Sequence, residues 1–420
     1  GDSTVDFGDP MSEHVVRLPS GLTVAVDPMP STRSVSIGVW VGVGARDEPA
    51  EQAGLSHFLE HLLFKGTDRR DAIAISRAID RVGGDINAFT SKEYTAYHCR
   101  VPARHAALGI EILGDVLSSP ALRDDDVERE RQVILEELAM DDDSPEDVVH
   151  REFSARLFDG HALGRDTGGE RSTVQALSAD AIRCFFDEHY RTENMVVAVA
   201  GAIDPDEVIR LVERGFDPMR SGSSSRRRIG PSGGAPVTTR IDIDDDTEQS
   251  HLVIGDIALS RTDPDREALD VANFVLGGGL SSRLFDEIRE RRGLAYSVFS
   301  STAAFCDTGV WSVYAGTMPE HRAEVESLVS AEITRLCEEG ITDEELDTAI
   351  GHLIGSYEMG LEDSAARMSR LGGQLSVFGE VRSIESQLDR WRAVTHEAVD
   401  RAVGRVFGTR TPLTVALGPR

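Results

Sequence analysis

Residues 53–67 read AGLSHFLEHLLFKGT, and this stretch decides how the rest of the chain is interpreted. It holds two histidines four positions apart, His57 and His61, with Glu60 directly before the second. Residues four apart on an α-helix lie on the same face, so both imidazoles can reach one metal ion. The apolar residues between and after them would bury the opposite side of the helix. We therefore predict a helix from about Gly54 to Phe64 with a metal-binding face.

Glu60 is expected to act beside the metal rather than to bind it. It lies one residue round the helix from His61, so its carboxylate projects next to the ion. That position suits a general base that takes a proton from a water molecule at the metal. The order H-x-x-E-H is the inverse of H-E-x-x-H and is the signature of inverzincins. A catalytic zinc ion also needs a third protein ligand, which must come from another element.

The best source of that ligand is the stretch DDDVERERQVILEELAMDDD at 124–143. Its apolar positions are expected to mark a buried face: Val127, Val133, Ile134, Leu138 and Met140. Glu130 and Glu137 are two helical turns apart and so lie on one side, where a zinc ion and its histidines would offset the cost of burying them. We predict Glu137 as the ligand and Glu130 as the residue that orients a ligand histidine. Glu136 stays a rival for Glu137, because periodicity does not separate neighbours.

The chain is strongly acidic. Asp and Glu total 73 against 44 Lys and Arg, for a formal net charge of −29, and only two of the basic residues are lysines, Lys65 and Lys92. Such an excess of negative charge repels phosphate backbones and anionic lipid, so nucleic-acid binding is not expected. It would suit basic peptides, although solubility, salt adaptation or a GC-rich genome is the simpler explanation.

The cysteine and hydropathy patterns favour a cytoplasmic location. The four cysteines are far apart and form no CxxC pair, which argues against a zinc knuckle and for a reducing compartment. No apolar run is long enough for a membrane span, so no membrane association is expected. The first residues lack the charged and apolar regions of a signal peptide, and we expect the native start at Met11.

Residues 220–240 separate two halves of similar organisation. They are rich in Ser, Gly, Pro and Arg without apolar periodicity, which predicts a linker between domains at 11–219 and 241–420. The second half repeats the order of strands and helices of the first, and its final stretch TPLTVALGP mirrors NMVVAVAGAI at 194–203. We predict an α+β protein of two similar domains of about 200 residues, each a mostly antiparallel sheet covered by helices.

Three stretches together resemble one known family. HFLEHLLFKGT at 57–67, GGDINAFTSKEYTAYH at 83–98 and ERQVILEEL at 130–138 are similar to the pitrilysin/insulysin superfamily of inverted-motif zinc peptidases. The likeness is greatest for the branch of the mitochondrial processing peptidase β-subunit and its bacterial single-chain relatives. It extends from about Arg17 to Leu417.

The resemblance implies a role for each candidate residue. It makes His57, His61 and Glu137 the zinc ligands, which removes the rivalry with Glu136, and it makes Glu60 the general base and Glu130 the supporting carboxylate. The resemblance also implies four substrate contacts: Asn87 and Ala88 in NAFTS, and Arg289 and Tyr296 in RERRGLAY. The last two would help to bind substrate and to stabilise the transition state.

The resemblance also implies a partner. Relatives of about a thousand residues join two such two-domain halves into a closed chamber, whereas this chain supplies one bowl-shaped half. A homodimer enclosing peptide substrates is therefore expected, with a heterodimer containing an inactive paralogue as the alternative. Two other functions stay open: a non-catalytic scaffold subunit with a vestigial site, which a complete ligand set argues against, and a non-proteolytic metal hydrolase.

Overall fold

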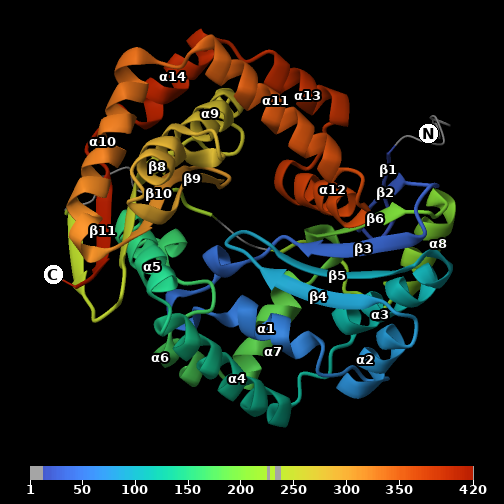
Figure 1. The fold of residues 1–420 in the computed structure, drawn as a ribbon. Coiled ribbons are helices and arrows are strands. Elements are labelled where there is room, and N and C mark those ends of the chain that lie inside the picture. Colours follow the sequence, from blue (N-terminus) through green and yellow to red (C-terminus); the bar gives the residue numbers. More distant parts are fainter. Residues whose placement is uncertain (1–12, 225–227, 232–237, 420) are drawn as a thin grey trace. The chain divides into compact units, whose positions relative to one another are not determined.

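Two β-sheets organise the chain, which is described here from a computed structural model covering residues 13–224, 228–231 and 238–419 (Figure 1). The expected start at Met11 and residues 225–227 and 232–237 of the expected linker lie outside these residues. The chain divides into two compact units, each built around one sheet. The first contains the described part of Gly1–Leu138 with Asp166–Arg228 and Met359–Val381, and the second contains Ala139–Arg165, Ile229–Glu358 and Arg382–Arg420 up to residue 419.

The sheet of the first unit has six strands in the order β1-β2-β6-β3-β5-β4. Their bounds are His14–Arg17 for β1, Thr23–Pro28 for β2, Ser34–Val41 for β3, Asp85–Thr90 for β4, Thr95–Pro102 for β5 and Met195–Gly201 for β6. All neighbours are antiparallel except β2 and β6. Strand β4 therefore lies at the edge, with β5 as its one neighbour among the described strands.

The sheet of the second unit repeats this order as β7-β11-β8-β10-β9. Its strands are Arg240–Asp244 for β7, Ser250–Ala258 for β8, Ala295–Ala304 for β9, Gly309–Thr317 for β10 and Leu413–Gly418 for β11. The single parallel pair of this sheet, β7 and β11, corresponds to the parallel pair β2 and β6 of the first sheet. Strand β9 occupies the edge position that β4 holds in the first sheet. The internal repeat predicted from the sequence is thus present in the strand order.

Helices cover the sheets. In the first unit they are α1 Leu55–Leu63, α2 Ala72–Asp80, α3 Ala106–Ser118, α4 Asp124–Asp142 (whose last residues pass into the second unit), α6 Arg171–Ala176, α7 Ala179–His189, α8 Pro205–Gly215 and α12 Ser364–Phe378. In the second unit they are α5 Pro145–Leu157, α9 Arg266–Asn273, the π-helices η6 Phe274–Gly278 and η7 Phe285–Arg291, α10 Arg322–Glu339, α11 Asp343–Gly360 (which ends in the first unit), α13 Ile384–Arg392 and α14 His396–Val406.

One helix in each unit comes from the other half of the sequence. Helix α12 packs on β2, β3 and β6 of the first sheet, on the face opposite to α1 and α3 (Figure 1). There Met368 and Leu371 join a buried cluster with Trp40, and the Gly372 Cα lies so close that an added Cβ would be 2.0 Å from the Trp40 ring. Helix α5 packs in the same way on β8 and β11 of the second sheet. The predicted domains 11–219 and 241–420 instead place α5 in the first domain and α12 in the second.

The buried strands show why both sheet faces are covered. Strand β3, SVSIGVWV, is rich in β-branched residues and seven of its eight positions are buried, a pattern typical of a strand between two helical layers. The α+β class and the two mostly antiparallel, helix-covered sheets predicted from the sequence are confirmed. Among the described helices, none combines the length and the apolarity that crossing a membrane requires.

Candidate metal centre

Helix α1 presents the two histidines and is anchored at its start by an acidic side chain. The Glu48 carboxylate accepts the backbone N–H groups of Gly54 at 2.8 Å and Ser56 at 2.6 Å. It thereby satisfies donors that have no partner inside the helix and places negative charge at the positive end of the helix dipole. Gly54 has φ +95°, and a Cβ there would be 2.5 Å from the Gly168 carbonyl oxygen, so only glycine fits. The helix start is therefore fixed in position.

The buried and exposed sides of α1 follow the predicted pattern. The side chains that enter the core are Leu55, Phe58, Leu59, Leu62 and Leu63. His57, Glu60 and His61 are only partly buried and lie away from that core. The apolar periodicity therefore turns the two imidazoles and the carboxylate to a common side, as expected for residues at this spacing.

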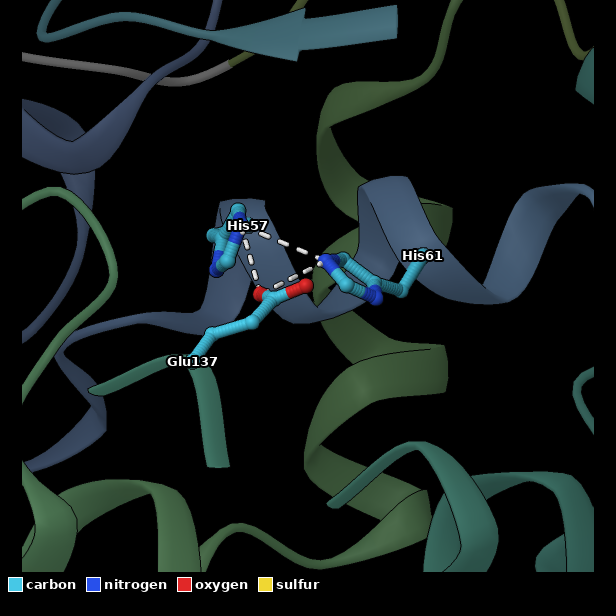
Figure 2. A group of neighbouring side chains, drawn as sticks. All are labelled: His57, His61 and Glu137. Atoms are coloured by element: carbon cyan, nitrogen blue, oxygen red, sulfur yellow. Dashed lines mark hydrogen bonds and ion pairs between the residues drawn. The ribbon is translucent and has the colours of Figure 1, made fainter. Parts of the chain in front are cut away.

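Glu137 of α4 meets the two histidines (Figure 2). His57 Nε2 is 3.3 Å from His61 Nε2, and Glu137 Oε2 is 3.4 Å from His61 Nε2 and 3.9 Å from His57 Nε2. Zinc bonds of about 2.0–2.1 Å at tetrahedral angles put neighbouring ligand atoms roughly 3.3 Å apart. The three separations thus agree with one zinc ion held by two imidazoles and one carboxylate. The residues present fit this metal.

Burial prepares His57 for the role of a ligand. Its removal from water, with a smaller contribution from the neighbouring His61, lowers the pKa of His57 to about 4. The ring is therefore neutral at physiological pH, as metal coordination by imidazole requires. Its Nδ1 is buried and has no hydrogen-bond partner among the described residues. The Nε2 atom is the one that points toward the other two candidate ligands (Figure 2).

Glu130 contacts the Nδ1 side of the His61 ring and is itself paired with Lys65. His61 Nδ1 lies 3.2 Å from Glu130 Oε2, and the other oxygen of this buried carboxylate lies 2.8 Å from Lys65 Nζ. A carboxylate next to Nδ1 favours the tautomer that carries its hydrogen there and leaves the Nε2 lone pair for a metal. Lys65 is four residues after His61, one of two lysines in the chain, and the spacing could have indicated its contact with the same site.

Glu60 does not belong to the convergent set, as expected for a general base. Thr90, the last residue of β4, donates its hydroxyl to Glu60 Oε2 at 2.5 Å. Burial raises the pKa of Glu60, while the Thr90 hydrogen bond and His61 oppose the rise and the Glu137 charge adds to it. One carboxylate oxygen is held by Thr90, and Oε1 is left as the acceptor for a proton. Thr90 was not predicted, because no local sequence pattern links it to Glu60, 30 positions away.

The two predicted substrate contacts lie on the edge strand that ends at Thr90. Asn87 pairs with His98 and Ala88 with Tyr97 in the β4–β5 register. The Asn87 side-chain oxygen accepts the Ala88 N–H at 2.8 Å. An edge strand offers backbone groups to an added strand, and here one of these groups is covered by the neighbouring side chain.

Arg289 and Tyr296 lie in the second unit and contact each other. The Arg289 guanidinium of η7 stacks over the rings of Phe285 and Tyr296, at 4.8 and 5.3 Å from their centroids. Tyr296 is the second residue of β9 and is 79% exposed, so its hydroxyl is available to a ligand. Such cation–π stacking holds the two side chains together as a pair.

The buried face predicted for α4 is only partly confirmed. Val127, Ile134 and Leu138 are buried as expected, but Val133 is 41% and Met140 71% exposed. Of the two neighbouring glutamates, Glu136 is exposed, whereas Glu137 turns to the histidines. A helix buries an arc of about 100° against its neighbours, and Val133 and Met140 lie outside that arc.

Comparisons with known proteins relate both halves of the chain to one family. A family model described as "Insulinase (Peptidase family M16)" matches residues 23–171, and one described as "Peptidase M16 inactive domain" matches residues 176–353. An uncharacterized zinc protease of Streptomyces coelicolor is 44% identical, with 96% of this chain and 88% of that protein covered. An uncharacterized zinc protease of Bacillus subtilis, YmxG, is 34% identical, with 92% and 94% covered.

Solved structures agree on the fold. A peptidase M16 inactive domain from Pseudomonas fluorescens superimposes with a TM-score of 0.91 at 20% identity, covering 97% of this chain and 98% of that one. A protease from Helicobacter pylori gives a TM-score of 0.90 at 24% identity, covering 97% and 100%. At these identities the likeness concerns the arrangement of the strands and helices.

Proposed function

Because this chain belongs to peptidase family M16, we propose that it is a zinc-dependent endopeptidase with Glu60 as its general base. The observation that carries the proposal is the convergence of His57, His61 and Glu137 at separations suited to zinc. Several relatives are named zinc proteases, and the same chemistry is proposed for this chain. Its substrates are peptides and unfolded polypeptide segments.

The mechanism assigns proton transfer to Glu60. His57, His61 and Glu137 would hold the zinc ion, which would lower the pKa of a water molecule and polarise the scissile carbonyl. Glu60 Oε1 takes the proton from the attacking water and delivers it to the leaving amine, while Thr90 holds Oε2. Burial raises the pKa of Glu60, and a carboxylate with a higher pKa is a stronger base toward the attacking water.

Substrate binding is proposed at the edge of the first sheet. An extended peptide adds to β4 through backbone hydrogen bonds, which explains a preference for unfolded segments over folded domains. The Ala88 N–H is one donor for this pairing, so the Asn87 side chain must release it when the peptide arrives. Asn87 can then bind a substrate backbone group itself. Since β4 ends at Thr90, the added strand is guided toward the general base.

In the second unit, Arg289 and Tyr296 are proposed to bind the substrate. An exposed phenol held by a stacked guanidinium suits hydrogen-bond donation to a developing oxyanion. We also propose a homodimer that encloses the substrate, as the family resemblance implies, with an inactive paralogue as the alternative partner. A cytoplasmic location is in keeping with the proposal, since no disulfide joins any two of the four cysteines.

The proposal is tested with purified protein and a mixed peptide library read by mass spectrometry. Three samples are compared: wild type, the Glu60→Gln variant with zinc bound, and wild type treated with a chelator. Cleavage by the untreated wild type alone is expected. Cleavage that survives in the Glu60→Gln variant at a similar rate would refute the role of Glu60. A wild type that holds no zinc and cleaves nothing would favour the scaffold function.

A further inference from the structure

A buried cluster of four charged side chains joins the segment between the two halves to the proposed active site. It consists of Arg46, Asp47, Glu93 and Arg228, and it is called the arginine clasp below. Arg46 Nη1 and Glu93 Oε1 are 2.7 Å apart, and both side chains are 2% exposed. Asp47 is 1% and Arg228 16% exposed. Two positive and two negative charges therefore balance each other away from water.

Arg228 is the member that comes from the predicted linker. Its Nε donates to Asp47 Oδ1 at 2.8 Å and its Nη2 to Asp47 Oδ2 at 2.7 Å, a two-pronged pairing that fixes the guanidinium plane. The same Nη2 donates to the Glu93 carbonyl oxygen at 2.6 Å. Three hydrogen bonds therefore hold the side chain of Arg228 against the first unit.

The arginine clasp holds the turn that follows the edge strand β4. This turn, residues 91–94, offers three successive carbonyls: Ser91 accepts the Ala45 N–H at 3.0 Å, Lys92 accepts the Arg46 N–H at 2.8 Å, and Glu93 accepts Arg228. The backbone approach is close, because a Cβ on Gly44 would lie 2.4 Å from the Ser91 oxygen. The turn directly follows Thr90, which bonds to Glu60.

The clasp also reaches the metal-binding helix. Asp47 Oδ2 accepts the Gly44 N–H at 3.0 Å, which fixes the short 3-10 turn at Ala45–Asp47. The next residue, Glu48, accepts the first N–H groups of α1. The Arg228 guanidinium is therefore connected to the site in two ways. It bonds to the turn that follows Thr90, and it bonds to Asp47, whose neighbour Glu48 anchors the start of α1.

We propose that Arg228 is a positioning residue that fixes the β4–β5 hairpin and the start of α1. Its three hydrogen bonds to Asp47 and to the Glu93 carbonyl involve neither the candidate ligands nor the general base. Its catalytic consequence rests on the proposed peptidase function, whereas its effect on the hairpin does not. Loss of Arg228 leaves the buried Asp47 carboxylate without its guanidinium partner and the Glu93 carbonyl without a charged donor.

The first test is hydrogen exchange of wild type, Arg228→Gln and a matched control. Arg220→Gln is the control, because Arg220 lies in the same segment and pairs with Asp187 with both side chains about half exposed. Amides of residues 85–94 are expected to exchange about tenfold faster in Arg228→Gln, with the amides of β2 and β6 unchanged and the control like wild type. Equal exchange of residues 85–94 in the variant and the control would overturn the proposal.

The second test separates positioning from a loss of folded protein. If the enzyme cleaves peptides, Arg228→Gln is expected to raise KM about tenfold, because the substrate strand meets a displaced β4. A variant that is merely less folded would lower kcat and leave KM unchanged, and that result would also count against positioning. A wild type without peptidase activity would refute the proposed function, while the exchange data would still decide the role of Arg228.

Arg228→Lys is a milder substitution that tests the proposal even if Arg228→Gln does not fold. Lysine keeps the positive charge but replaces the two-pronged pairing with a single ammonium group. Exchange of residues 85–94 between that of wild type and that of Arg228→Gln is expected. If Arg228→Gln is unfolded, exchange in Arg228→Lys identical to wild type would contradict the proposal.

Discussion

Replacing Lys65 by methionine should weaken zinc binding, although the lysine touches no ligand atom. Lys65 Nζ holds Glu130 Oε1 at 2.8 Å, and the other oxygen of Glu130 faces His61 Nδ1 at 3.2 Å. Methionine fills a similar volume without the charge, so Glu130 loses the contact that orients it. The change tests whether the support behind His61 determines affinity for the metal.

The structure sets the size of the effect. Loss of a group that supports a metal ligand costs about 10- to 100-fold in metal affinity. The lower end applies here, because Glu130 itself remains and the Lys65 side chain is 38% exposed, so water takes over part of its role. A loss of about tenfold is expected, which equals about 1.4 kcal/mol.

Competition with a chelator of known affinity measures the zinc dissociation constant directly. Arg77→Met serves as the control, since it removes a positive charge from an exposed position of α2. The control should bind zinc like wild type, and Lys65→Met about tenfold more weakly. A dissociation constant for Lys65→Met within twofold of wild type would refute the supporting role of Lys65.

Three further predictions concern other parts of the chain. Thr90→Val should lower kcat about tenfold with zinc content unchanged, because the general base loses a charged hydrogen bond, and Thr90→Ser should restore most of it; equal rates for all three proteins would remove Thr90 from the site. Gly372→Ala should lower the free energy of unfolding by about 2–3 kcal/mol through contact with the Trp40 ring. Gly373→Ala, where a Cβ meets no atom within 4 Å, should be neutral or slightly stabilising in the same denaturant titration, and equal effects would contradict the packing of α12. Burial raises the pKa of Asp270 from 3.8 to about 6, so its contribution to stability is full below about pH 4 and lost as pH rises through 6. The Asp270 side chain is 25% exposed, which reduces the loss of unfolding free energy to about 1–2 kcal/mol. Asp270→Asn should abolish this part of the pH dependence of stability, and an unchanged pH profile would contradict the prediction.

Local pattern was sufficient to predict the parts of the site that lie on one element. The spacing of His57, Glu60 and His61 predicted a common helix side, since the helical period alone determines it. It did not separate Glu136 from Glu137, because two neighbours differ by only about 100° and the face toward α1 depends on packing. Thr90 and Glu48 contact the helix from outside it, and periodicity carries no signal for such contacts. Lys65 lies four residues after His61, so its spacing carried a signal that the prediction did not use.

Local sequence pattern also predicted only part of the fold. Alternation and repeated order predicted two similar sheets, because each strand's pattern reports its own burial. The exchange of α5 and α12 was not predicted, since an apolar helix face indicates that the helix is buried but not which sheet it covers.

X-ray absorption at the zinc edge tests the central claim most directly, namely that two histidines and one glutamate of this chain hold a zinc ion. The wild type should bind one zinc per chain with only nitrogen and oxygen neighbours at about 2.0–2.2 Å. Glu137→Gln should bind it more weakly with the histidine signal retained. Sulfur neighbours at about 2.3 Å, or zinc binding that is unchanged when His57 and His61 are both replaced by alanine, would contradict the account.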